Sequence, residues 1–118
     1  MNQAHDRAAD RLRGVSVSDG DIVAPALIPR AVTAGELVFS DRATQVFQAD
    51  GETTYVENGR PTTGQWSVDK GHFSSFWPPS YRASYELRWI VEDGTIVGLR
   101  FTELGRGSQF EGRYRVHS

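Results

Sequence analysis

The sequence concentrates aromatic side chains in one short tract, GHFSSFWPPSYRASY, which spans residues 71–85. Its five rings fall within thirteen residues: Phe73, Phe76, Trp77, Tyr81 and Tyr85. Aromatic rings provide large apolar contact areas, and tyrosine adds a hydroxyl that can orient a bound molecule. In one interpretation, Trp77 and Tyr81 form the mouth of a pocket with Tyr85 and Trp89 deeper inside. In the other interpretation, the rings only fill a core.

Few groups are candidates for proton transfer. Most carboxylates fall in turns or on the polar side of alternating runs, where a solvated charge is the common role. Glu57 differs, because it shares strand parity with Tyr55 and could present a carboxylate at the end of a barrel, where burial would favour acid or base use. Tyr81 and Tyr85 are the other candidate catalytic residues.

Metal, thiol and nucleotide chemistry lack the residues that they need. The chain has no cysteine and three histidines, two of which, His5 and His117, lie near its ends. His72 has Ser74 and Ser75 close by in sequence, but such neighbours on one strand do not form the orienting network of a nucleophile. No glycine-rich phosphate-binding loop is present. We therefore expect no metal and no cofactor.

Composition indicates one globular domain. The 118 residues are 38% hydrophobic and 24% charged, with a net charge of −2 and scattered basic residues, so nucleic acid is not an expected partner. The sequence contains no run of about 18 apolar residues and no apolar signal segment. We expect a cytoplasmic protein without a membrane partner, and a homodimer stays open.

The first 35 residues differ from the rest because they are not predicted to form strands. Residues 1–13 contain good helix formers but Leu12 is the only large apolar residue after Met1, which predicts a flexible or short helical arm. Pro25 and Pro29 forbid a long helix in residues 14–35, which we interpret as an ordered crossing segment or lid. Residues 36–118 form the predicted barrel domain.

From residue 36 onward the apolar pattern has a period of two. Asp50-Gly51, Asn58-Gly59 and Asp93-Gly94 are typical of hairpin turns. The pattern predicts eight strands, at residues 36–40, 43–49, 52–57, 61–69, 71–77, 81–91, 95–103 and 108–117. Without a helix layer, the sheet hides its apolar face most economically by closing into a single antiparallel up-and-down barrel of the lipocalin or calycin type. A two-sheet sandwich is the alternative.

Alternation also predicts which residues face inward. In YRASYELRWIV, residues 81–91, aromatic and aliphatic residues occupy one side and Arg82, Glu86 and Arg88 the other. A barrel of about eight strands encloses enough volume for its own side chains or for one small ligand. The candidate ligand-binding residues are Gln65, Trp66, Trp77, Tyr81, Tyr85, Trp89, Phe101, Phe110 and Tyr114.

Two runs, TTYVENGRPTTGQWSVD at residues 53–69 and YELRWIVEDGTIVGLRF at residues 85–101, share order and spacing with a known group of barrels. They contain a Gly-x-Trp at Gly64 to Trp66, a strand ending near Trp89, and a Gly-Thr-x-Val-x-Leu-x-Phe strand that begins at Gly94. In these features the chain resembles the calycin-like barrels that include the bacterial phenolic acid decarboxylases and the molybdenum cofactor biosynthesis protein F (MoaF-like) family. The resemblance covers about residues 50 to 104.

The resemblance implies a barrel with an interior small-molecule site, but not decarboxylation. Gln65 occupies the position of the decarboxylases' substrate-contacting arginine, and Val91, followed by Glu92, occupies that of their essential glutamate. The family pattern would also place Gln65 in the pocket, whereas alternation places Trp66 on the core side.

Three functional hypotheses follow. The first is a protein that binds a small organic molecule in an apolar, aromatic-lined cavity without turnover. The second is a cofactor-free lyase, isomerase or cyclase that acts on a small aromatic or apolar substrate in the same cavity. The third is a structural or interaction module whose barrel is filled by its own side chains.

Overall fold

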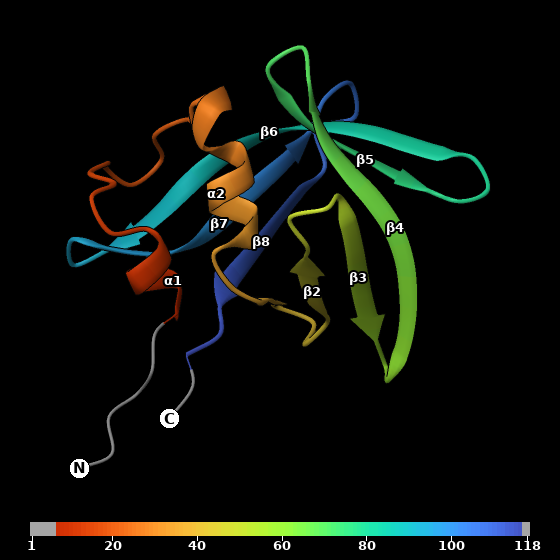
Figure 1. The fold of residues 1–118 in the computed structure, drawn as a ribbon, viewed down its shortest axis with the longest axis horizontal. Helices are drawn as coiled ribbons and strands as arrows, with labels where there is room; N and C mark the ends of the chain where they lie inside the picture. Colours follow the sequence, from red (N-terminus) through yellow and green to blue (C-terminus); the bar gives the residue numbers. More distant parts are fainter. Residues whose placement is uncertain (1–6, 117–118) are drawn as a thin grey trace.

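Eight strands form one closed antiparallel barrel in a computed structural model that describes residues 7–116. Each strand pairs with the next along the chain, and β8 closes the barrel by pairing with β1, so the predicted up-and-down barrel is confirmed and the sandwich is wrong (Figure 1). The strands are β1 Leu37–Phe39, β2 Thr44–Phe47, β3 Glu52–Glu57, β4 Arg60–Asp69, β5 His72–Trp77, β6 Tyr81–Glu92, β7 Thr95–Glu103 and β8 Gln109–Tyr114.

The tight turns have the backbone conformation that their residues predict. Asn58 and Gly59, between β3 and β4, have φ values of 53° and 76°, and Asp93 and Gly94, between β6 and β7, have 52° and 75°. Two successive positive φ values are the signature of the type I′ turn, whose twist matches that of the strands it joins. These turns therefore fix the register of the long hairpins.

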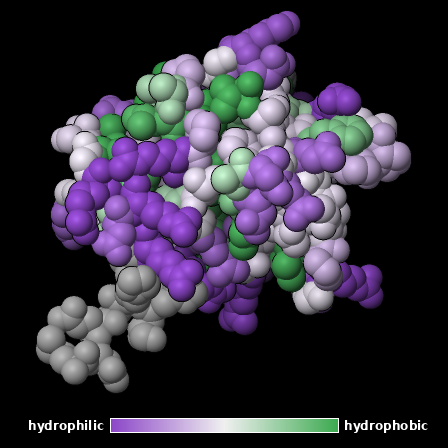
Figure 2. Space-filling model, viewed as in Figure 1, coloured by the Kyte–Doolittle hydropathy of each residue, from purple (hydrophilic) through white to green (hydrophobic). Residues whose placement is uncertain are grey.

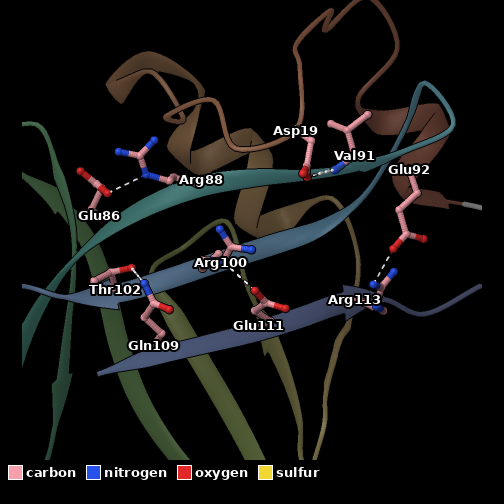
Figure 3. Close-up of polar contacts among 10 residues, drawn as sticks. All are labelled: Asp19, Glu86, Arg88, Val91, Glu92, Arg100, Thr102, Gln109, Glu111 and Arg113. Atoms are coloured by element: carbon pink, nitrogen blue, oxygen red, sulfur yellow. Dashed lines mark hydrogen bonds and ion pairs between the residues drawn. The ribbon is translucent and has the colours of Figure 1, made fainter. Parts of the chain in front are cut away.

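Alternation divides the strands into an inner and an outer face. Leu37, Trp89 and Leu99 point inward and are almost completely buried. On the outer face of β6, β7 and β8 the charged side chains pair with one another, as Figure 3 shows: Arg100 Nε lies 2.6 Å from Glu111 Oε2, and Arg113 Nη2 lies 2.6 Å from Glu92 Oε2. Solvent screens exposed pairs of this kind and makes their contribution small, so burial on the inner face dominates stability.

The N-terminal segment packs against the barrel and closes one end. It contains α1 Arg7–Arg11, the 3-10 helix η1 Pro25–Leu27 and α2 Ile28–Thr33. Ala8 and Leu12 are buried, so the described part of the arm is a short packed helix, which is the second of the two predicted alternatives, flexible or short helical. Arg30 explains this order, because its guanidinium donates hydrogen bonds of 2.7 Å to the carbonyl oxygens of Arg11 and Arg13 and so caps the end of α1.

A further stretch of this segment covers the part of β6 that extends beyond β5. Gly20 N–H donates to the Trp89 carbonyl at 2.9 Å, and Trp89 N–H donates to the Asp21 carbonyl at 2.9 Å. The Asp19 carboxylate accepts from the Val91 N–H at 2.9 Å (Figure 3). These bonds satisfy backbone groups that an uncovered strand edge would leave open.

The surface is of mixed polarity. Figure 2 shows hydrophilic residues over much of one face, with hydrophobic residues in separate groups. No helix among residues 7–116 is long and apolar enough to cross a membrane.

Candidate functional site

The barrel contains a cavity of about 690 Å³ that reaches the surface at the end opposite the N-terminal helices. Its volume lies within the range of sites that hold drug-sized molecules. Eight aromatic residues line it: Phe39, Phe47, Tyr55, Phe73, Trp77, Tyr85, Phe101 and Phe110. Seven polar residues complete the lining: Ser40, Asp41, Gln45, Thr62, Ser75, Gln109 and Glu111.

The aromatic rings pack against one another and form a continuous floor and wall. Phe47 stacks on Phe101 with ring centroids 6.4 Å apart, and Phe73 meets Phe101 edge to face at 5.6 Å. Nearer the mouth, Tyr55 meets Trp77 edge to face at 6.4 Å. Rings held in this way by their neighbours offer a preformed apolar surface, which lowers the entropic cost of binding.

Ser75 places a buried hydroxyl in this wall without a hydrogen-bond partner. The residue is 7% exposed, and its Oγ bonds to no other atom of the described chain. The Tyr85 hydroxyl lies beside it, and hydrogen bonding by Ser75 opposes the effect of burial by lowering the pKa of Tyr85, although the Ser75 Oγ forms no direct hydrogen bond in this structure. A buried hydroxyl without a partner costs about 1 to 3 kcal/mol, so a ligand that bonds to Ser75 would recover this energy.

Tyr85 in the cavity wall and Tyr81 outside it both keep their hydroxyls in the neutral form. Burial raises the pKa of Tyr85 to about 12, and the negative charge of Glu103 acts in the same direction. The Tyr81 hydroxyl donates a 2.9 Å hydrogen bond to Glu103 Oε2, and this bond is the largest cause of the raised pKa of Tyr81. Both groups are therefore hydrogen-bond donors at neutral pH.

The polar residues at the mouth include a carboxylate. Asp41 lies in the β1–β2 turn, where its Oδ1 accepts a 3.0 Å hydrogen bond from the Ala43 N–H. Tyr55 lies within its influence, because burial and then the charges of Asp41 and Glu57 raise the pKa of Tyr55. Gln45, further in, donates from Nε2 to the Thr53 hydroxyl at 3.0 Å.

Four of the predicted ligand-binding residues, Trp77, Tyr85, Phe101 and Phe110, line the cavity together. Tyr81 lies outside the lining and is 40% exposed. Glu57 is exposed at the end of β3 and also lies outside the lining.

The competing placements of Gln65 and Trp66 are resolved in favour of alternation. Trp66 is 9% exposed and faces inward, where it stacks on Phe73 beneath the cavity floor and donates from Nε1 to the Gln48 carbonyl at 2.8 Å. Gln65 is exposed on the outer face, beside a smaller hollow of about 340 Å³.

The remaining two predicted residues, Trp89 and Tyr114, lie at the closed end of the barrel. The Tyr114 hydroxyl donates a 2.6 Å hydrogen bond to the Ala31 carbonyl of α2, and burial raises its pKa. Trp89 is 1% exposed and its Nε1 has no partner within the described chain. Neither side chain belongs to the cavity lining: Tyr114 is bonded to α2, and Trp89 belongs to the buried cluster that includes Ala31 and Val32 of α2.

The sequence analysis missed several lining residues. Phe39, Phe47 and Phe73 share the inward parity of predicted strands, so the alternation that identified Phe101 could also have identified them. Asp41 lies in a turn and Ser75 is a small polar residue on an inward position, and no local pattern distinguishes such residues from ordinary ones.

The described residues offer no obvious metal centre. Within residues 7–116, no three histidine, aspartate or glutamate side chains gather closely enough to hold an ion, and His72 is exposed on β5. The chemistry that the site offers is thus apolar burial, hydroxyl donors and a carboxylate at the mouth.

Comparisons with family models, with curated proteins and with solved structures found no match to this chain. The closed eight-stranded antiparallel barrel is consistent with a calycin-like fold.

Proposed function

We propose that the barrel binds one small, mostly apolar organic molecule in its open cavity, without turnover. The observation that carries this proposal is the aromatic-lined cavity of about 690 Å³ with the unpartnered hydroxyl of Ser75 in its wall. A barrel that served only as a structural module would fill this space with its own side chains. Ligand sites commonly combine an apolar lining with a few placed polar groups, as this one does.

We propose a relationship to the MoaF-like and phenolic acid decarboxylase families on the basis of short shared motifs. The barrel fold supports it, and so does the presence of an inner cavity. Decarboxylation is not part of the proposal, because Gln65 lies on the outside and Val91 occupies the position of the catalytic glutamate.

The test uses the neutral fluorescent probe N-phenyl-1-naphthylamine with a matched pair of variants. Thr62 lines the mouth and its neighbour Thr63 points outward, and both are exposed. We expect saturable binding of one probe per chain, weakened roughly tenfold, or about 1.4 kcal/mol, by Thr62→Trp and unchanged by Thr63→Trp. Absence of saturable binding, or equal effects of the two variants, would contradict binding inside the barrel.

A second candidate function is a cofactor-free isomerase or lyase, and one contact favours it. Glu103 is 8% exposed, accepts from the Tyr81 hydroxyl, and acts electrostatically on Tyr85, which lines the cavity. Tyr85, neutral at physiological pH, would donate a hydrogen bond to the oxygen of a bound carbonyl, while solvent water entering through the open mouth would accept the proton that leaves the α-carbon.

This candidate predicts exchange of the α-hydrogens of 2-tetralone for deuterium in heavy water, followed by NMR. Exchange that is faster than in buffer and is lost in Tyr85→Phe, with probe binding retained, would support turnover. Exchange at the buffer rate would leave binding as the function.

A further inference from the structure

The charged residues that line the cavity are of one sign. Asp41 and Glu111 line it, whereas no lysine, arginine or histidine among residues 7–116 does. Glu111 is already paired with Arg100 at 2.6 Å on the outer face. Asp41 forms no ion pair with the described residues, and its contact with Ala43 uses only Oδ1. The mouth therefore carries an uncompensated carboxylate with a free oxygen.

Glu57 adds to this negative field. It lies two residues after Tyr55 on β3, on the same side of the strand, and burial, then the charge of Asp41 and then that of Glu57 raise the pKa of this cavity-lining hydroxyl. Arg42 neighbours Asp41 and Arg60 pairs with Glu57 in the β3–β4 register, but neither arginine lines the cavity or forms an ion pair with these carboxylates.

The rings of the lining are also suited to a cation. The face of an aromatic ring carries partial negative charge and attracts a cation, most strongly where water is excluded. The protein's own ring-bound guanidinium groups lie elsewhere: Arg82 over Phe76, at 4.3 Å, and Arg106 near Tyr81, at 5.9 Å. Within the described chain, the cavity rings have no such partner.

Ser75 gives the site an independent sign that it is built for a ligand. Its side chain is more than nine-tenths buried in the cavity wall, and its Oγ has no partner in the described chain. A hydroxyl can accept as well as donate, so it suits the N–H or O–H of a ligand whose apolar body fills the aromatic floor.

We propose that the ligand of this cavity is an organic cation, a protonated or quaternary amine on an aromatic or alicyclic body. The nitrogen lies at the mouth, among Asp41, Phe39, Tyr55 and Trp77, and the body lies on the rings below. The inference rests on the proposed binding function and specifies its ligand class. It excludes carboxylates of the kind that an arginine-bearing pocket would select, because desolvating an anion beside Asp41 is unfavourable.

The experiment compares three ligands that share a naphthalene body and differ in charge: (2-naphthylmethyl)trimethylammonium, neutral 2-neopentylnaphthalene and 2-naphthylacetate. Their affinities are measured by isothermal titration calorimetry at neutral pH and low salt. We expect the cation to bind about tenfold or more tightly than the carboxylate. The quaternary nitrogen donates no hydrogen bond, so a preference for it over the neutral isostere reports charge alone.

Two matched variants locate the charge. Asp41→Asn removes the carboxylate at the mouth, and Asp50→Asn removes one from the β2–β3 turn at the other end of the barrel. The two aspartates make the same local bond, since each Oδ1 accepts from the N–H two residues later at 3.0 Å. Asp41→Asn should lower the affinity for the cation about three- to tenfold and leave the affinity for the neutral ligand unchanged. Asp50→Asn should change neither affinity.

The outcomes separate this inference from the proposed function. If the carboxylate binds as tightly as the cation, or if Asp41→Asn and Asp50→Asn have equal effects, the cation proposal is overturned although binding in the cavity stands. If none of the three ligands and not even N-phenyl-1-naphthylamine binds, the proposed function falls as well.

Discussion

Replacing Ser75 by alanine separates the stability of the empty barrel from its affinity for a ligand. The Ser75 hydroxyl is buried without a partner, at a cost of about 1 to 3 kcal/mol. Alanine removes this cost and loses only the packing of one oxygen atom. We therefore expect the free energy of unfolding to rise by about 1 kcal/mol, which corresponds to an increase in Tm of roughly 4 °C for a domain of this size.

The affinity should change in the opposite direction. A ligand with a hydroxyl, such as 2-naphthol, gains a hydrogen bond to Ser75 that naphthalene cannot form. Ser75→Ala should weaken the binding of 2-naphthol by about 1 kcal/mol, or roughly fivefold, and leave the binding of naphthalene unchanged. A substitution that stabilises the protein and weakens binding is typical of a functional site whose polar group is kept at the expense of stability.

The control is the neighbouring residue of the same strand. Ser74 lies on the outer face, where its hydroxyl is 3.0 Å from that of Ser84. Ser74→Ala should lower the free energy of unfolding by up to about 1 kcal/mol without any effect on binding. Urea denaturation followed by circular dichroism measures stability, and calorimetry measures affinity. If Ser75→Ala destabilises the protein as much as Ser74→Ala does, the Ser75 hydroxyl has a partner and the reasoning is refuted.

Three further predictions follow from other contacts. Burial raises the pKa of Tyr85 from 10.0 to about 12, so the unfolded chain loses this proton at a lower pH than the folded chain, and the free energy of unfolding should fall as the pH rises from 10 toward 12. Tyr85→Phe should reduce the slope of the free energy of unfolding against pH, as measured by urea denaturation across this range. An unchanged slope would contradict the shift. Trp66 Nε1 donates to the Gln48 carbonyl, whereas Trp89 Nε1 has no partner in the described chain. Trp89→Phe should therefore lower the free energy of unfolding by about 1 kcal/mol less than Trp66→Phe does. Equal losses in Tm would argue against this difference. A Cβ on Gly98 would overlap the carbonyl oxygen of Gly112 across β7 and β8, so Gly98→Ala should cost about 3 kcal/mol or more in thermal unfolding, whereas Gly35→Ala, with its nearest contact at 3.5 Å, should be tolerated.

The strands and their order could be predicted because both depend on local patterns, whereas the choice of a closed barrel over a sandwich depended on the absence of a helix layer. The period of two in residues 81–91 and 95–103 marks long strands, and the Asn-Gly and Asp-Gly pairs mark the turns between them. The N-terminal segment was harder to predict, because Ala8 and Leu12 are too few to form a visible stripe. The order of α1 depends instead on the long-range hydrogen bonds of Arg30.

The sequence predicted which residues of the candidate site face inward but not how deep in the barrel they lie. Parity in the sequence places Trp77, Tyr85, Trp89 and Phe101 on the inner face, and it correctly chose Trp66 over Gln65. Parity says nothing about depth, because the stagger between neighbouring strands fixes how far along the barrel axis each residue lies. Only the closed barrel placed Trp89 under the N-terminal helices and Tyr85 in the cavity.

The amino-acid sequence alone determined the antiparallel strands, the turns between them and their aromatic inner face, since alternation and turn chemistry are properties of neighbouring residues. The tertiary structure decided which end of the barrel is open, that Ser75 has no partner, and that Asp41 is the uncompensated charge at the mouth. These features depend on which distant strands and loops converge, and no local pattern encodes that convergence.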